Sequence, residues 1–244
     1  ERIFAELKLI LHADEKYGIR YAQYDGLKLL EGTDVLNYIL PELAAGKGMA
    51  QRADFHAHDV LEHSLRACKY ADRRVRLAAL LHDVGKPAAF AETGKFHGHD
   101  VYGEKIARQV LERLKAPKKT TDEVCRLTAL HMYDLDGKAR ESKIRTFLVK
   151  NSDVYELLLL VKQADYSACK DDLHECPTIG KWEAIRKKML AEGVPFRLKE
   201  LALRGDELRG IVPAAQTGEV LQKLLLYCAQ DGRRNKRDTL LAEA

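Results

Sequence analysis

Histidines are concentrated in one part of this chain. Seven of the nine lie between residues 56 and 131: His56, His58, His63, His82, His97, His99 and His131. Imidazole nitrogens bind transition metals and exchange protons near neutral pH. A single histidine is most often a surface residue or a satisfied core residue, so the order of the histidines and their neighbours must show which of them do chemistry.

His82 and Asp83 form the first candidate pair. They follow the apolar stretch LAALL (77–81), and the next four residues, VGKP (84–87), are typical of the end of a helix. A neutral imidazole and an ionised carboxylate together suit Mn, Fe, Co, Ni or Zn better than Ca. The pair therefore predicts two metal ligands where a buried helix ends.

Further ligands must come from other helices, because neighbouring side chains on one helix point about 100° apart. His63 lies on the polar side of the amphipathic segment VLEHSLRACKYA (60–71), and a turn near Asp72 folds this segment back toward His82. Asp165 interrupts the apolar segment LLLLVKQADYSA (157–168). A buried aspartate is costly unless it is paired, so Asp165 is either a metal ligand or the partner of a lysine or arginine.

Three of these features together resemble the HD phosphohydrolase superfamily: the triplet Glu62-His63-Ser64, the string LLHDVGKP (80–87), and an aspartate in an apolar helix. Ligands in that family read H…HD…D, and members with two metals add two histidines before the final aspartate. HGHDVYGEKIA (97–107) and TALHM (128–132) supply these two histidines. The resemblance implies one or two divalent ions (Mn, Fe, Co, Ni or Zn, with Mg as a further option) held by His63, His82, Asp83, His99, His131 and Asp165.

Such a site implies hydrolysis of a phosphorylated small molecule or an RNA end. A bound metal makes water acidic enough to supply a nucleophile near neutral pH. We expect Asp83 to bridge two metals; with one metal, His99 and His131 would contact phosphate oxygens and protonate the leaving group. Lys86 is placed to neutralise charge on the phosphoryl group, although a lysine in a turn is as often a surface residue. His56 and His58 are expected to be exposed, with substrate contact as the alternative.

The elements that position these residues are predicted to be helices throughout. Apolar residues recur at helical spacing along most of the chain, no alternating strand pattern is found, and glycines and prolines separate the segments. We predict an all-α fold, a multi-helix HD-domain bundle with flanking helical segments. The expected parts are a helical segment (1–50), the phosphohydrolase domain (51–190) and a basic C-terminal helical segment (191–244).

The flanking segments resemble a second family. ERIFAELKLIL and NYILPEL, near the start, are similar to the RNA-binding helical region that follows the catalytic head of bacterial tRNA nucleotidyltransferases and poly(A) polymerases. PFRLKELALRGDEL and TGEVLQKLLLYCAQDGRRNKRDTLL are similar to their C-terminal end. The Gly-Ser and paired-acid strand motif of nucleotidyl transfer is not found, so we expect no catalytic head in this chain. A non-catalytic RNA-binding body and tail is therefore the alternative to a hydrolase, with tRNA as partner.

Net charge points in the same direction. Residues 181–244 hold 13 basic and 9 acidic residues, which accounts for the whole formal net charge of +4. Basic side chains attract phosphates without sequence preference, although a solvated surface explains a modest excess equally well. The candidates for RNA contact are Arg204, Arg233, Arg234, Lys236 and Arg237.

Cysteine usage and hydropathy suggest the cellular setting. The five cysteines form no CxxC pair, and an odd number argues against a disulfide framework, so we expect reduced thiols in a cytoplasmic protein. No apolar run approaches the roughly 20 residues that cross a bilayer, so no membrane partner is expected. The oligomeric state is left open.

Overall fold

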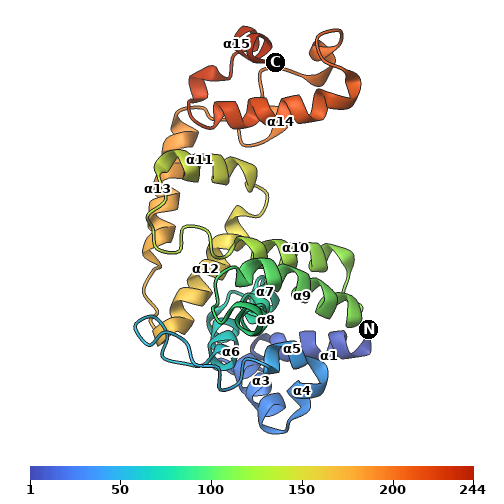
Figure 1. Ribbon diagram of the computed structural model, residues 1–244, viewed down its shortest axis with the longest axis vertical. Coiled ribbons are helices and arrows are strands. Elements are labelled where there is room, and N and C mark those ends of the chain that lie inside the picture. Colours follow the sequence, from blue (N-terminus) through green and yellow to red (C-terminus); the bar gives the residue numbers. More distant parts are fainter. The chain divides into compact units, whose positions relative to one another are not determined.

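The computed structural model describes residues 1–244, and its regular elements are helices (Figure 1). Only one isolated β-bridge is formed, between Arg209 and Val212. The prediction of an all-α fold is confirmed. No helix combines the length and the apolar character that a membrane span requires. The chain divides into two compact units, Glu1–Tyr133 with Glu156–Cys176, and Asp134–Tyr155 with Pro177–Ala244.

Most of the helices belong to the first unit. They are α1 (Arg2–Leu11), α2 (Ala13–Tyr17), α3 (Ala22–Gly32), α4 (Val35–Ile39), α5 (Pro41–Ala44), α6 (Val60–Tyr70), α7 (Arg76–Leu81), α8 (Lys86–Thr93), α9 (His99–Arg113), α10 (Lys118–Leu130) and nearly all of α12 (Tyr155–Lys170). Local signals fix several of their ends. Asp59 caps α6 by accepting a hydrogen bond from the Glu62 amide at 2.7 Å, and Pro87 occupies the first turn of α8.

Apolar stripes on these helices form the core of the first unit. The aliphatic side chains with almost no exposed surface include Leu65, Leu80, Leu81, Val110, Leu111, Leu127 and Leu158. Helix α9 runs beside α10, and α7 packs on α6 and on α10. Burial of each such side chain contributes about 1.5 to 3 kcal/mol. The helix ends that carry the polar candidates are therefore held by a well-packed interior.

A close backbone approach joins the start of α8 to α9. An added Cβ at Gly85 would lie 2.1 Å from the His99 carbonyl oxygen and 2.4 Å from the Gly103 amide nitrogen. The backbone of Gly85 is ordinary and right-handed, with φ −81°, so the restriction is one of space. Glycine at position 85 thus lets the turn after His82-Asp83 lie directly against the first turn of α9.

The second unit contains α11 (Glu141–Lys150), α13 (Pro177–Ala191), α14 (Thr217–Cys228) and α15 (Arg237–Glu243), with short 3-10 turns at Leu198–Glu200, Gly205–Leu208, Ala214–Gln216 and Gly232–Arg234. Trp182 is fully buried, and the centre of its ring lies 5.2 Å from that of Phe147. Its indole nitrogen donates to Asp134 Oδ2 at 2.9 Å. An aromatic pair with a satisfied polar atom organises this unit.

The limits of the two units differ from the boundaries expected near residues 50 and 190. Residue 50 lies inside the first unit and residue 190 inside α13 of the second. One reason is that α3 packs on α6, where Gln23 Nε2 donates to the Lys69 carbonyl at 3.1 Å. The other is that the chain leaves the first unit after Tyr133 and returns to it at Glu156. The functional assignment of segments 1–50, 51–190 and 191–244 stays a prediction.

Replacing Gly85 with alanine should destabilise the protein strongly, because the new methyl group meets backbone atoms that cannot rotate away. We expect the free energy of unfolding to fall by about 3 kcal/mol, the upper end of the range for overpacked sites. Gly32→Ala is the matched control, since an added Cβ there meets nothing within 4 Å. Urea unfolding curves of both variants test this expectation, and equal midpoints would contradict it.

Candidate metal centre

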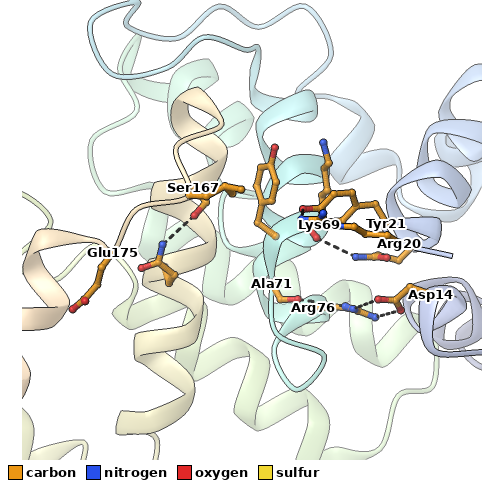
Figure 2. Close-up of a pocket in the computed structure, with 12 residues that line it drawn as sticks. Asp14, Arg20, Tyr21, Lys69, Ala71, Arg76, Ser167 and Glu175 are labelled. Atoms are coloured by element: carbon orange, nitrogen blue, oxygen red, sulfur yellow. Dashed lines mark hydrogen bonds and ion pairs between the residues drawn. The ribbon is translucent and has the colours of Figure 1, made fainter. Parts of the chain in front are cut away.

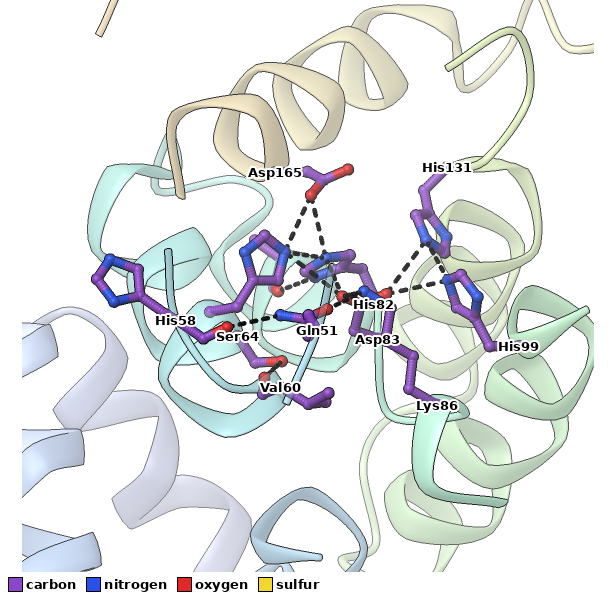
Figure 3. Close-up of polar contacts among 12 residues, drawn as sticks. Gln51, His58, Val60, Ser64, His82, Asp83, Lys86, His99, His131 and Asp165 are labelled. Atoms are coloured by element: carbon purple, nitrogen blue, oxygen red, sulfur yellow. Dashed lines mark hydrogen bonds and ion pairs between the residues drawn. The ribbon is translucent and has the colours of Figure 1, made fainter. Parts of the chain in front are cut away.

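Four side chains from three helical segments converge at the first group of ligand atoms. His63 comes from α6, His82 and Asp83 directly follow α7, and Asp165 comes from α12 (Figure 3). His63 Nε2 lies 3.2 Å from His82 Nε2 and 3.0 Å from Asp165 Oδ1, and His82 Nε2 lies 3.2 Å from Asp83 Oδ2. Atoms bound to one ion at 2.0 to 2.2 Å are about 3 to 3.5 Å apart, so these spacings suit a single metal.

A second group lies on the other oxygen of Asp83. His99 is the first residue of α9 and His131 follows α10. Asp83 Oδ1 is 3.0 Å from His99 Nε2 and 3.7 Å from His131 Nε2, and the two imidazole nitrogens are 3.2 Å apart. Asp83 thus offers one oxygen to each group (Figure 3). All six residues predicted from the sequence come together around this carboxylate.

Backbone carbonyls set the orientation of three of the imidazole rings. His82 Nδ1 donates to the Ala79 carbonyl at 2.7 Å, and His99 and His131 make the same bond to the carbonyls three residues before them, at 2.7 and 2.6 Å. In a neutral ring the proton on Nδ1 leaves a lone pair on Nε2. The lone pairs of His99 and His131 then face each other at 3.2 Å, an arrangement that repels unless a cation lies between them.

Burial makes the charges of this cluster strongly interdependent. The six side chains belong to residues that are at most 7% exposed. Burial opposes charge on Asp83, but the neighbouring His82 and Lys86 outweigh it and hold the pKa of that carboxyl well below its usual range. Burial likewise opposes protonation of His82, yet Asp83 and Asp165 raise its pKa to about 10. A metal that binds here must displace that proton, as metal ligands require.

Asp165 was expected to bind either a metal or a basic side chain. Its Oδ1 contacts two imidazoles, His63 Nε2 at 3.0 Å and His82 Nε2 at 3.5 Å. Burial opposes its charge, but hydrogen bonds from these two rings keep its pKa well below the usual range. A carboxylate surrounded by imidazoles favours the metal alternative over the ion pair.

Two lysines make supporting contacts that were not foreseen. The Lys86 ammonium lies 2.6 Å from Asp83 Oδ2 and donates to Gln51 Oε1, also at 2.6 Å. Lys162 is 2% exposed and donates to the carbonyls of His131 and Tyr133, at 3.2 and 2.8 Å. Lys162 lies inside an apolar helix, which was a visible signal in the sequence that it has a buried partner. Nothing in the sequence indicated the contact of Gln51 with Lys86.

Three further histidines, His56, His58 and His97, lie at the edge of the metal centre or away from it. His58 Nε2 is 3.2 Å from Asp171 Oδ2, and His97 is exposed. The His56 ring is partly buried and packs edge-on against His63, with ring centres 4.7 Å apart. Only His56 therefore touches a candidate ligand.

A polar cavity of about 530 Å³ also lies in the first unit (Figure 2). Its walls include Gln23, Lys69, Arg76 and Ser167, and Asp14 closes a two-pronged ion pair with Arg76 at 2.7 and 2.6 Å. None of the six candidate ligands lines this cavity. The metal centre is therefore assigned to the histidine cluster and not to the cavity.

The five basic candidates for RNA contact lie in the second unit. Arg233 pairs with Asp231 at 2.9 Å and Arg237 with Glu207 at 2.6 Å, so part of the positive charge is compensated locally. Arg234 donates to the Tyr227 carbonyl at 3.1 Å. Arg204 and Lys236 are exposed. RNA contact at these side chains stays a prediction.

Comparison with known families agrees with this geometry. Residues 54–168 match the family model described as the HD domain, and this range contains all six clustered residues. The chain carries an HD domain. Of its six candidate ligands, five come from helices α6 to α10 or the residues that follow them, and the sixth comes from α12.

Similarity to whole proteins extends beyond the HD domain. The chain is similar to the A-adding tRNA nucleotidyltransferase of Deinococcus radiodurans, with 34% identity over 82% of this chain and 49% of that protein. It is also similar to the CC-adding tRNA nucleotidyltransferase of Thermus thermophilus, with 32% identity over 85% of this chain and 49% of that protein. A multifunctional CCA protein of Hahella chejuensis is 32% identical over 57% of this chain and 36% of its own length. The chain spans about half the length of the first two relatives.

Manganese loading followed by elemental analysis should separate the two ligand groups. Asp83→Asn should bind little or no metal, because the shared side chain loses its negative charge and one of its two oxygens, whereas His99→Ala should lose only the ion of the second group. Mn²⁺ is chosen because carboxylates and imidazoles bind it more readily than thiolates do. The exposed His97→Ala is the matched control and should bind as much as the unaltered chain. Unchanged metal content in Asp83→Asn would rule out this arrangement.

Proposed function

We propose that the HD domain of this chain is a divalent-metal-dependent phosphohydrolase. The observation that carries the proposal is the division of Asp83 between two groups of imidazoles, with Oδ2 near His63 and His82 and Oδ1 near His99. Paired metals about 3.5 to 4 Å apart, often bridged in this way, are typical of phosphatases and nucleases. Imidazole and carboxylate donors fit Mn, Fe, Co, Ni or Zn, and Mg less well.

The chain's own residues would act by holding and orienting. His63, His82, Asp83 and Asp165 would hold one ion, and His99 and His131 would hold a second with Asp83. When bound, a divalent metal supplies a Lewis acid that polarises a phosphate oxygen and makes a water molecule more acidic. The carbonyls of Ala79, Phe96 and Thr128 would keep the imidazole nitrogens aimed at the centre throughout.

The sequence suggested that Lys86 neutralises charge on the phosphoryl group, and its contacts support a further role at Asp83. Its ammonium forms an ion pair with Asp83 Oδ2 and donates a hydrogen bond to Gln51 Oε1, and its side chain is 8% exposed. These contacts support a positioning role, in which Lys86 fixes the carboxylate that the two groups share. Charge neutralisation at a phosphoryl oxygen stays a second proposed role for the same ammonium.

The proposed substrates are phosphate esters of nucleotides, 2′,3′-cyclic phosphates or RNA ends. Support for a link to RNA comes from the relatives, which are named as enzymes that add nucleotides to tRNA. A metal-dependent hydrolase within an RNA-processing protein would act on the phosphates found at RNA ends. This link, like the substrate class, is part of the proposal.

Hydrolysis of a generic phosphodiester and of 2′,3′-cyclic nucleotides, measured with added Mn²⁺ or Ni²⁺, tests the proposal. Asp83→Asn and His82→Ala should each lower kcat/KM by at least about 100-fold, because a directly bound ligand matters no less than its outer-shell partners. His97→Ala should leave the rate unchanged. Hydrolysis that survives both a chelator and the Asp83 substitution would refute the assignment.

A second candidate function is RNA binding without catalysis. Similarity to tRNA nucleotidyltransferases over more than 80% of this chain favours it, since that likeness includes helices outside the HD domain. The exposed Arg204 and Lys236 in the second unit would then contact phosphates. The two functions are compatible, and their tests differ.

Titration with tRNA at two salt concentrations tests this second function. Arg204→Ala combined with Lys236→Ala should weaken binding and make it less dependent on salt, with the slope of log K against log salt reduced by up to about 2. Lys223→Ala is the control, because Lys223 is exposed in the same unit and already paired with Glu219 at 2.8 Å. No measurable affinity at low salt would exclude the RNA-binding function.

A further inference from the structure

His63 differs from the other histidines of the HD centre in one respect. His82, His99 and His131 each donate their Nδ1 proton to a backbone carbonyl, but His63 Nδ1 is buried and has no hydrogen-bond partner. The residue is 0% exposed, so water does not compensate for the missing bond. A buried donor or acceptor left unpaired costs about 1 to 3 kcal/mol. An atom of this kind, beside a metal centre, indicates a missing partner.

His56, which packs against His63, also has a buried nitrogen without a hydrogen-bond partner. This nitrogen is Nδ1, and the His56 ring packs edge-on to His63 with ring centres 4.7 Å apart. Cys169 completes a group with these two residues: one donor atom from each lies within 4.8 Å of the other two. Cys169 is a free, partly buried thiol, one helical turn after Asp165 on α12. Two imidazoles, each with an unpartnered Nδ1, therefore lie together with a free thiol.

Backbone contacts hold this group in place. The Ala57 amide, adjacent to His56, donates to the Cys169 carbonyl at 2.8 Å. Lys170, adjacent to Cys169, donates from Nζ to the Asp54 carbonyl at 2.6 Å. The loop that carries His56 is thus joined to the end of α12 on both sides of the group. The two segments are thus joined by one backbone–backbone bond and by one bond from a lysine side chain to the backbone.

We propose that His56, His63 and Cys169 form an additional metal-binding site, which shares only His63 with the groups around Asp83 and suits a borderline or soft ion such as Zn²⁺ or Co²⁺. Two imidazoles and a thiolate with one open position form a recognised donor set for such ions. Two nitrogens bound to one zinc ion are about 3.3 Å apart and a nitrogen and a sulfur about 3.6 Å, so donor atoms within 4.8 Å of one another need to approach by about 1.5 Å or less.

Charge at this site changes when a cation enters. Burial, followed by the nearby carboxylates Asp165 and Asp83, raises the pKa of the Cys169 thiol to about 12, so the free thiol is protonated at neutral pH. A bound cation reverses this balance, because a coordinating thiol is deprotonated outright. The thiol proton leaves to solvent. If His63 Nε2 also serves the HD centre, the Nδ1 proton leaves too and the ring bridges the two sites.

The additional site would also give His63 a partner for its Nδ1 atom, which the other three imidazoles already have. A metal on Nδ1 would fix this ring in place of the carbonyl that orients His82, His99 and His131. The site would therefore act as a structural support for the first ligand group of the HD centre. Its existence does not depend on whether the HD centre hydrolyses phosphates.

Cobalt titration of the full chain, first stripped of metal with a chelator, tests the proposal by absorption. A thiolate bound to Co²⁺ gives a charge-transfer band in the near ultraviolet, which imidazole and carboxylate ligands do not. We expect this band in the unaltered chain and in His99→Ala, in which Cys169 is intact. Cys169→Ser and His56→Ala should lose it and bind one ion fewer.

Cys176→Ser is the matched control, because Cys176 is nearby in the chain and outside the group, and it should keep the band. Circular dichroism shows whether each variant folds. X-ray absorption of the zinc-loaded unaltered chain gives a measurement that needs no variant: a Zn–S distance of about 2.3 Å is expected. Absence of both the cobalt band and the Zn–S distance, or a band that persists in Cys169→Ser, would overturn the proposal. Loss of hydrolysis with the band intact would count only against the proposed function.

Discussion

The carboxylate of Asp83 is the constraint around which the first unit is arranged. It is 1% exposed, and burying a charge of this kind costs several kcal/mol unless opposite charges or donors surround it. Four imidazoles and the Lys86 ammonium supply that surrounding, and they come from α6, α7, α8, α9 and α10 or the residues that follow these helices. The packing of these helices into one core places all of these polar side chains around the two buried oxygens of Asp83.

Helix ends solve the geometric part of this problem. His82 and His131 lie just beyond α7 and α10, and His99 begins α9, so each ring can reach a carbonyl three residues earlier. Such a bond fixes both the tautomer and the direction of the ring. The close contact of Gly85 with α9 then brings Asp83 and His99 within 3.0 Å. Orientation and distance are thus set by the backbone before any metal binds.

The helical spacing of apolar residues predicted the all-α fold. Residue type and position marked His63, His82-Asp83 and Asp165, because Asp165 interrupts an apolar helix and His82-Asp83 follow one, whereas His99 and His131 were expected only from the resemblance to the HD superfamily. The supports were harder to foresee. Gln51 and Cys169 look like ordinary loop and helix residues, and their meeting with Lys86 and His56 depends on contacts between segments far apart in the chain. The limits of the two compact units could not be foreseen for the same reason, since the departure of the chain at Tyr133 and its return at Glu156 leave no mark in composition.

The return of the chain at α12 has a kinetic meaning. Asp165 meets His63 across 102 positions, and the chain between them includes the segment Asp134–Tyr155 of the second unit. Closing so long a loop is entropically slow compared with forming the local hairpin of α9 and α10. The second ligand group can therefore assemble early from neighbouring helices, while the first waits until α12 packs. Occupancy of the complete centre would thus report that both chain segments of the first unit have come together.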